Sequence, residues 1–178
     1  MRNPFALLGL PESLLLDPAS VETAWRDLSR EGQDGDETEA SALNHARTVL
    51  ADPVSRLAAW LEVMAPGLAP DRAIAPSLMD LFSKIGPVLA TTDAVLARHR
   101  KATTALARAM LAKEAIAAQL AVQDLLPQIQ SLKTALTDRF GEFEAGDFKA
   151  ASRALGQLKF LKRWEEQCRE RLLALIAT

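Results

Sequence analysis

The chain has 178 residues and a mass of 19.3 kDa, which is enough for one or two domains. Its 32 alanines and 29 leucines favour helices, whereas valine and isoleucine are scarce and tyrosine is absent, so the composition predicts an all-α fold and excludes all-β and α/β folds. Residues 1–75 hold 6 Lys and Arg against 12 Asp and Glu, and residues 76–178 hold 15 against 11, which indicates two units, neither basic enough to predict nucleic-acid binding.

Residues 1–65 are predicted to form helices that pack as an antiparallel hairpin. Asp17-Pro18 and Asp52-Pro53 are helix-start signals, because an Asp side chain caps free N–H groups and Pro fits the first helical turn. Between them, a further helix is predicted over about residues 37–51. In each helix apolar residues recur every three or four positions, which gives it one buried face. We expect the common core to contain Trp25, Leu28, Leu43, Ala46, Leu50, Leu57 and Leu61.

A linker is predicted at residues 66–75, since prolines and a glycine gather there and the sign of the charge changes. The predicted domains are therefore residues 1–65 and residues 76–178. The second domain is predicted to begin with a short helix near residues 77–85 that breaks at Gly86-Pro87.

A long helical stretch is predicted from that break to about Phe143, and Pro127 is expected to kink it or to start a new helix. The last helix begins near Phe148. It carries apolar residues at steps of three and four, among them Leu161, Trp164 and Cys168, which is typical of a seam in a helical bundle.

The sequence predicts no catalytic, metal or cofactor site. The run Asp34-Gly35-Asp36-Glu37 is acidic, but Glu39 and His45 stand where a calcium loop needs Gly and Glu. His45 has no partner for acid–base work, and Cys168 lies on the apolar seam, so both are expected to be structural. We therefore expect a protein that is not an enzyme and has no cofactor.

Membrane segments are also not expected. No segment approaches the ~18 consecutive apolar residues of a membrane span. The Leu-rich start is broken by Gly9 and Pro11, so it lacks the continuous apolar region of a signal peptide. We expect a cytoplasmic protein.

Four apolar residues are predicted to form one exposed face that binds a protein: Leu78, Met79, Phe82 and Phe160. Leu78 and Phe82 belong to the apolar stripe of the helix after the linker, and Met79 widens that stripe. Phe160 lies about 100° from Leu161 around the last helix and points away from the seam. An exposed aromatic beside a Met/Leu face is typical of a binding hot spot. The alternative is that other helices cover these residues.

The order of these motifs resembles the HscB-type co-chaperones. Asn3-Pro4-Phe5 with Leu8-Gly9-Leu10 is similar to the start of a J-domain. The other matching segments are residues 24–28, 43–50 and 52–56 for the J-domain, and residues 77–80, 146–151 and 157–163 for the C-terminal half. The resemblance implies a J-like helical hairpin domain followed by a three-helix bundle. In that family the bundle binds the iron–sulfur scaffold protein, and the J-domain activates a DnaK-type chaperone, HscA.

The sequence departs from the family at the J-domain loop. Family members carry His-Pro-Asp between the second and third helices, where this chain has Gly32, Gln33, Asp34, Gly35 and Asp36. The second helix offers Arg26 and Arg30, but it lies in the acidic half of the chain. We therefore expect no stimulation of ATP hydrolysis by a DnaK- or HscA-type chaperone.

At the C-terminal half the resemblance carries over to the predicted face. Leu78, Met79, Phe82 and Phe160 match the apolar positions that contact the scaffold, whereas Ser83 and Gly86 stand near the positions of accompanying acidic residues. The stretch between Phe82 and Phe160 is longer than in the family, so we expect an extended hairpin. The resemblance implies a co-chaperone or protein-binding module of iron–sulfur cluster assembly. The alternatives are a J-like adaptor that binds another client without any DnaK-type partner, and an unrelated helical enzyme.

Overall fold

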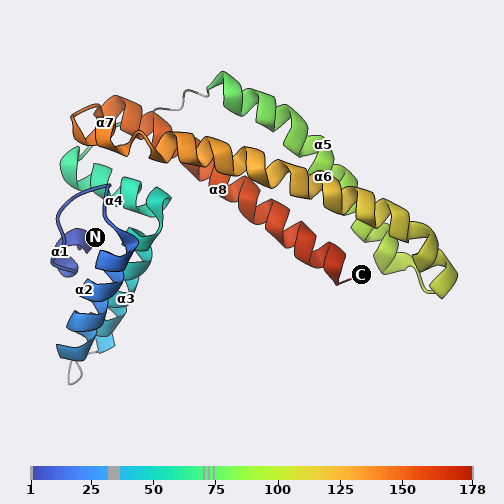
Figure 1. Ribbon diagram of the computed structural model, residues 1–178, viewed down its shortest axis with the longest axis horizontal. Helices are drawn as coiled ribbons and strands as arrows, with labels where there is room; N and C mark the ends of the chain where they lie inside the picture. The colour runs from blue at the N-terminus through green and yellow to red at the C-terminus, as the bar shows by residue number, and fades with distance from the viewer. Residues whose placement is uncertain (1, 32–36, 70, 72, 74, 178) are drawn as a thin grey trace. The chain divides into compact units, whose positions relative to one another are not determined.

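The computed structural model describes residues 2–31, 37–69, 71, 73 and 75–177, and over these residues the fold is all-α (Figure 1). By its internal contacts the chain divides into two compact units. Unit 1 comprises Met1–Arg72 and Leu136–Gly156, and unit 2 comprises Ala73–Ala135 and Gln157–Thr178. The helices are α1 (Pro4–Leu7), α2 (Pro18–Glu31), α3 (Glu37–Ala51), α4 (Pro53–Met64), α5 (Pro76–Lys101), α6 (Ala105–Thr137), α7 (Phe140–Glu144) and α8 (Phe148–Ile176).

The helices of unit 1 begin at the predicted signals. Helix α2 starts at Pro18, and the preceding Asp17 accepts a hydrogen bond from the backbone N–H of Ala19 at 3.2 Å. Helix α4 starts at Pro53, and the Asp52 carboxylate accepts from the backbone N–H of Ser55 at 2.9 Å. Both carboxylates satisfy N–H groups that the first helical turn leaves without a partner.

Helix α3 packs against α1, α2 and α4, and most of the predicted core is confirmed. The prediction was wrong for Trp25 and Leu28, which are only half-buried. The indole Nε1 of Trp25 donates to Asn44 Oδ1 at 3.0 Å, and the Arg47 guanidinium lies 4.3 Å from the ring centre. These polar partners hold the ring at the edge of the α2–α3 contact. The predicted core residues that are buried are Leu43, Ala46, Leu50, Leu57 and Leu61.

Trp60 is the aromatic centre of unit 1. Its side chain is 1% exposed, its ring stacks on Phe148 with centroids 5.5 Å apart, and its Nε1 donates to the Glu12 carbonyl at 3.1 Å. Phe140 and Phe143 are also buried. Residues 136–156 therefore pack with the N-terminal helices, although the predicted domain ended at residue 65. The domain boundaries themselves stay a prediction.

Unit 2 is a bundle of α5, α6 and the part of α8 from Gln157 onward (Figure 1). Lys84 contacts Gln128 and Arg98 contacts Glu114, so α5 and α6 run antiparallel. Lys133 pairs with Glu165, whereas Ala118 clusters with Leu175, so α8 is antiparallel to α6 as well. The predicted seam residue Cys168 is buried, and burial raises the pKa of its thiol.

The predicted break at Gly86-Pro87 is wrong, because α5 continues through it to Lys101. Pro87 and Ser83 are both exposed, so water can reach the carbonyl that Pro87 leaves without a helical N–H donor. Pro127 likewise lies inside α6.

The chain turns instead after Lys101, a position that the sequence pattern did not identify. Helix α5 ends on four basic residues, which suit the negative end of a helix. Thr104 Oγ1 then accepts from the backbone N–H of Ala107 at 3.2 Å and caps α6. The long hairpin expected in this half is thus formed by α5 and α6. In the described part of the chain, no helix combines the length and apolar character that crossing a bilayer requires.

Candidate functional site

Two exposed phenylalanines of unit 2 converge on one tryptophan. Phe82 on α5 is 61% exposed and Phe160 on α8 is 48% exposed, whereas Trp164 is buried beneath them. The ring centroid of Trp164 lies 5.8 Å from that of Phe82 and 6.2 Å from that of Phe160. These are the separations of aromatic rings in favourable contact. Trp164 therefore joins helices α5 and α8 into one apolar surface.

Met79 and Leu78 have opposite environments, although they are adjacent on α5. Met79 is 53% exposed and lies one helical turn before Phe82, so it extends the same surface. Leu78 is 2% exposed, and the prediction that it is exposed was wrong. It shares the buried side of α5 with Leu81 and Ile85. We call the surface made by Met79, Phe82, Phe160 and the underlying Trp164 the aromatic face.

Trp164 is the member of the aromatic face that the sequence pattern placed only on the seam. It follows Phe160 by four residues, so the two side chains lie on neighbouring turns of α8. From that four-residue spacing the sequence could have predicted that Trp164 lies beside Phe160. The contact with Phe82 comes from another helix and depends on how α5 packs against α8.

The surroundings of the aromatic face on α8 are basic. Residues 148–164 contain no Asp or Glu but five Lys and Arg, and of these Lys159 and Arg163 are exposed beside Phe160. A partner that covers the face meets these cations at its rim, so charge complementarity favours an acidic partner surface.

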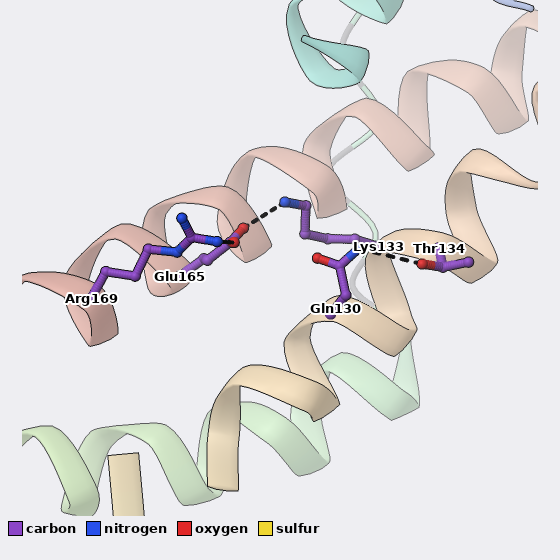
Figure 2. Close-up of polar contacts among 5 residues, drawn as sticks. All are labelled: Gln130, Lys133, Thr134, Glu165 and Arg169. Atoms are coloured by element: carbon purple, nitrogen blue, oxygen red, sulfur yellow. Dashed lines mark hydrogen bonds and ion pairs between the residues drawn. The ribbon is translucent and has the colours of Figure 1, made fainter. Parts of the chain in front are cut away.

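A partly buried ion pair links α8 to α6 at the residue after Trp164, and Figure 2 shows its members Lys133, Glu165 and Arg169. The Lys133 ammonium on α6 lies 2.5 Å from Glu165 Oε2, and Arg169 lies 2.5 Å from Glu165 Oε1. The Glu165 side chain is only 14% exposed. Burial alone would raise its pKa, but the hydrogen bonds and charges of Lys133 and Arg169 outweigh burial and hold the pKa below the usual value.

The Glu165→Gln variant tests how much these ion pairs stabilise the fold. We expect the free energy of unfolding at neutral pH to fall by about 1–3 kcal/mol, because Lys133 loses its charged partner. Since the folded pKa of Glu165 is depressed, its contribution is complete above the unfolded pKa of about 4.3 and is lost as pH falls through the folded pKa. Urea denaturation of both proteins at pH 7 and at about pH 3 measures this. A difference in stability that is the same at both pH values contradicts the assignment.

The other predicted functional segment is the loop that replaces His-Pro-Asp, Gly32, Gln33, Asp34, Gly35 and Asp36. It lies outside the described residues.

Two solved structures share the architecture of this chain. The crystal structure of human co-chaperone protein HscB matches with a TM-score of 0.68 and 19% identity, over 96% of this chain and 82% of that chain. The chaperone HscB from Vibrio cholerae matches with a TM-score of 0.57 and 19% identity, over 94% of this chain and 96% of that chain. The chain has the HscB fold. The predicted arrangement of a J-like part and a helical bundle is thereby confirmed. No protein-family model and no curated protein matches the sequence.

Proposed function

We propose that this protein is a protein-binding module of iron–sulfur cluster assembly and that its aromatic face binds the scaffold protein. The convergence of Phe82 and Phe160 on Trp164 carries the proposal. Water-exposed aromatic and methionine side chains that lie together are costly to keep unless a partner covers them. The HscB fold supports the choice of partner, since one of the matching structures is a co-chaperone.

Titration calorimetry with a purified iron–sulfur scaffold protein tests the proposal. We expect saturable binding that weakens as salt rises, because Lys159 and Arg163 flank the aromatic face. A scaffold that does not bind at low salt rejects the proposed partner. Binding that is unaffected by changes in the aromatic face rejects the proposed site.

We expect no acceleration of ATP hydrolysis by a DnaK- or HscA-type chaperone. Residues 32–36 contain neither the His nor the Pro of the His-Pro-Asp contact, and the surrounding half of the chain is acidic. Single-turnover hydrolysis with and without this protein measures the effect, and a J-domain that carries His-Pro-Asp serves as the positive control. A robust acceleration that persists at moderate salt contradicts this expectation.

The lack of His and Pro in residues 32–36 also favours a second candidate function. In this alternative the protein is a J-like adaptor that binds a client without any DnaK-type chaperone. The adaptor and the scaffold-binding module differ in the partner that the aromatic face holds. Binding of the scaffold protein in the calorimeter therefore separates the two.

A further inference from the structure

A second surface of unit 2 lies on the other side of α5 from the aromatic face. Asp80, Leu81 and Lys84 line a hollow of about 420 Å³ with Pro127, Gln128 and Leu132 of α6. At 100° per residue, Phe82 lies about 160° around α5 from both Asp80 and Lys84. The hollow and the aromatic face are thus separate surfaces.

A second hollow of about 360 Å³ continues the first along the same helices. Its walls are Val88, Thr91 and Val95 of α5, with Ala117 and Ala121 of α6. The lining residues of α5 recur at steps of three and four from Asp80 to Arg98, so they share one helix face. Together the hollows form a groove between α5 and α6, which we call the hairpin groove. At 1.5 Å per residue it is about 27 Å long.

The hairpin groove leads to a tip that has no buried core of its own. Residues 98–117 include no buried side chain, and the hydrophobic cluster that joins the C-terminal end of α8 to the hairpin contains Val95, Ala118 and Leu175, with Ala115 against it. Figure 1 shows the turn between α5 and α6 beyond the end of α8. Leu106 and Met110 at this tip are 72% and 73% exposed. At the tip α5 and α6 expose apolar side chains, and further helices that pack on them would bury these side chains.

The charges along the hairpin groove are polarised. Residues 94–113 contain five Lys and Arg and no Asp or Glu, so the tip is strongly basic. The opposite end carries Asp80 and one cation, Lys84, and Asp124 of α6 lies level with the middle of the groove; all three are exposed. An antiparallel pair of hairpins places each basic tip beside the end of the other copy that carries Asp80. A parallel pair would gather ten cations at one end.

We propose that a second copy of this chain covers the hairpin groove, so that α5 and α6 of two copies form an antiparallel four-helix arrangement. Such a layer matches the groove in shape, because Ala117 and Ala121 allow close approach of helices. The groove is about 27 Å long and two packed helices are about 20 Å wide. Each copy would therefore bury about 540 Å² of surface in the dimer, and the pair about 1,100 Å². That area reaches the ~1,000 Å² that a specific interface needs.

Sedimentation velocity of the full chain from about 1 to about 200 μM tests the proposal, with dimerisation expected within this range. We expect a species of twice the 19.3 kDa chain mass at the upper end. Ala117→Glu is expected to weaken self-association at least tenfold, because Ala117 lines the half of the groove nearer the tip and is exposed in the single chain. A chain that stays monomeric throughout overturns the proposal.

Two variants show whether a dimer uses the hairpin groove. Ala112 is also exposed on α6 but lies about 140° around the helix from Ala117, so Ala112→Glu should leave the dimer intact. Phe160→Ala alters the aromatic face and should also leave it intact. Dissociation by Phe160→Ala but not by Ala117→Glu moves the contact to the aromatic face and rejects the groove. Circular dichroism confirms that each variant is folded.

Engineered cysteines test the antiparallel orientation. Thr91 lies near the middle of the groove and Thr104 lies at the tip, and both are exposed. With a mild oxidant, Thr91→Cys should link two copies through a disulfide, whereas Thr104→Cys should not. A link at residue 104 without one at residue 91 contradicts the antiparallel arrangement.

Discussion

The Trp60→Ala variant is expected to lose about 3–5 kcal/mol of unfolding free energy, the cost of truncating a large buried aromatic. A buried ring and two specific contacts are lost together. The ring is 1% exposed, it stacks on Phe148 at 5.5 Å, and its Nε1 donates to the Glu12 carbonyl at 3.1 Å. Because Phe148 belongs to α8, the loss should also loosen residues 136–156 from the N-terminal helices.

Urea denaturation followed by far-ultraviolet circular dichroism measures the loss, and Trp25→Ala is the matched control. Trp25 is half-buried, and its partners are Asn44 at 3.0 Å and the Arg47 guanidinium at 4.3 Å from the ring centre. We expect Trp25→Ala to cost about 1–2 kcal/mol, the sum of one hydrogen bond and one cation–π contact. Equal losses in the two variants would mean that both tryptophans belong to the core.

The two tryptophans show what the sequence determines about the fold. Spacing identifies the apolar side of a helix, and capping residues identify its start, as at Asp17-Pro18 and Asp52-Pro53. The spacing does not show whether an aromatic ring on that side lies inside the core or at its edge. Trp25 stays at the edge because α3 offers it an amide and a guanidinium, and those partners depend on tertiary packing.

The hairpin shows a second limit. Pro87 has a strong local signal for a break, yet α5 passes through it because the affected carbonyl can be hydrated on an exposed side. The actual turn after Lys101 has a weak local signal, Thr104 as a cap and a run of basic residues before it. On the far side of Pro87, Val95 and Leu96 of α5 pack with Ala118 and Leu175, and this tertiary packing favours a helix that continues past the proline.

The part of the candidate site that depends on positions around a single helix could be predicted from the sequence. Phe160 lies off the seam of α8 by angle alone, and its 48% exposure agrees. The sequence placed Leu78 in the apolar stripe of its helix, and that stripe is the side that α5 buries, whereas Met79 and Phe82 at its edge stay exposed. Trp164 joins the two helices through contacts that no single-helix pattern contains.

The Phe160→Ala variant is expected to weaken binding of the scaffold protein by about 2 kcal/mol or more, roughly 30-fold in Kd. Phe160 presents a large apolar area to solvent while its other side rests on Trp164, so a partner can bury the ring without rearranging α8. Folding should change little, because the ring is already half in water. The loss of its contact with Trp164 accounts for about 0.5–1.5 kcal/mol of stability.

Calorimetric titration and urea denaturation of the same preparations separate these effects. Phe82→Ala should behave like Phe160→Ala, because both rings rest on Trp164. Leu106→Ala removes a side chain that is 72% exposed at the far end of the hairpin, and it should bind the scaffold like the unaltered protein. If all three variants bind equally well, the aromatic face is not the contact. If Phe160→Ala unfolds, its ring supports the packing of α8 on α5, and the exposed surface that motivates the proposed function is part of the fold instead.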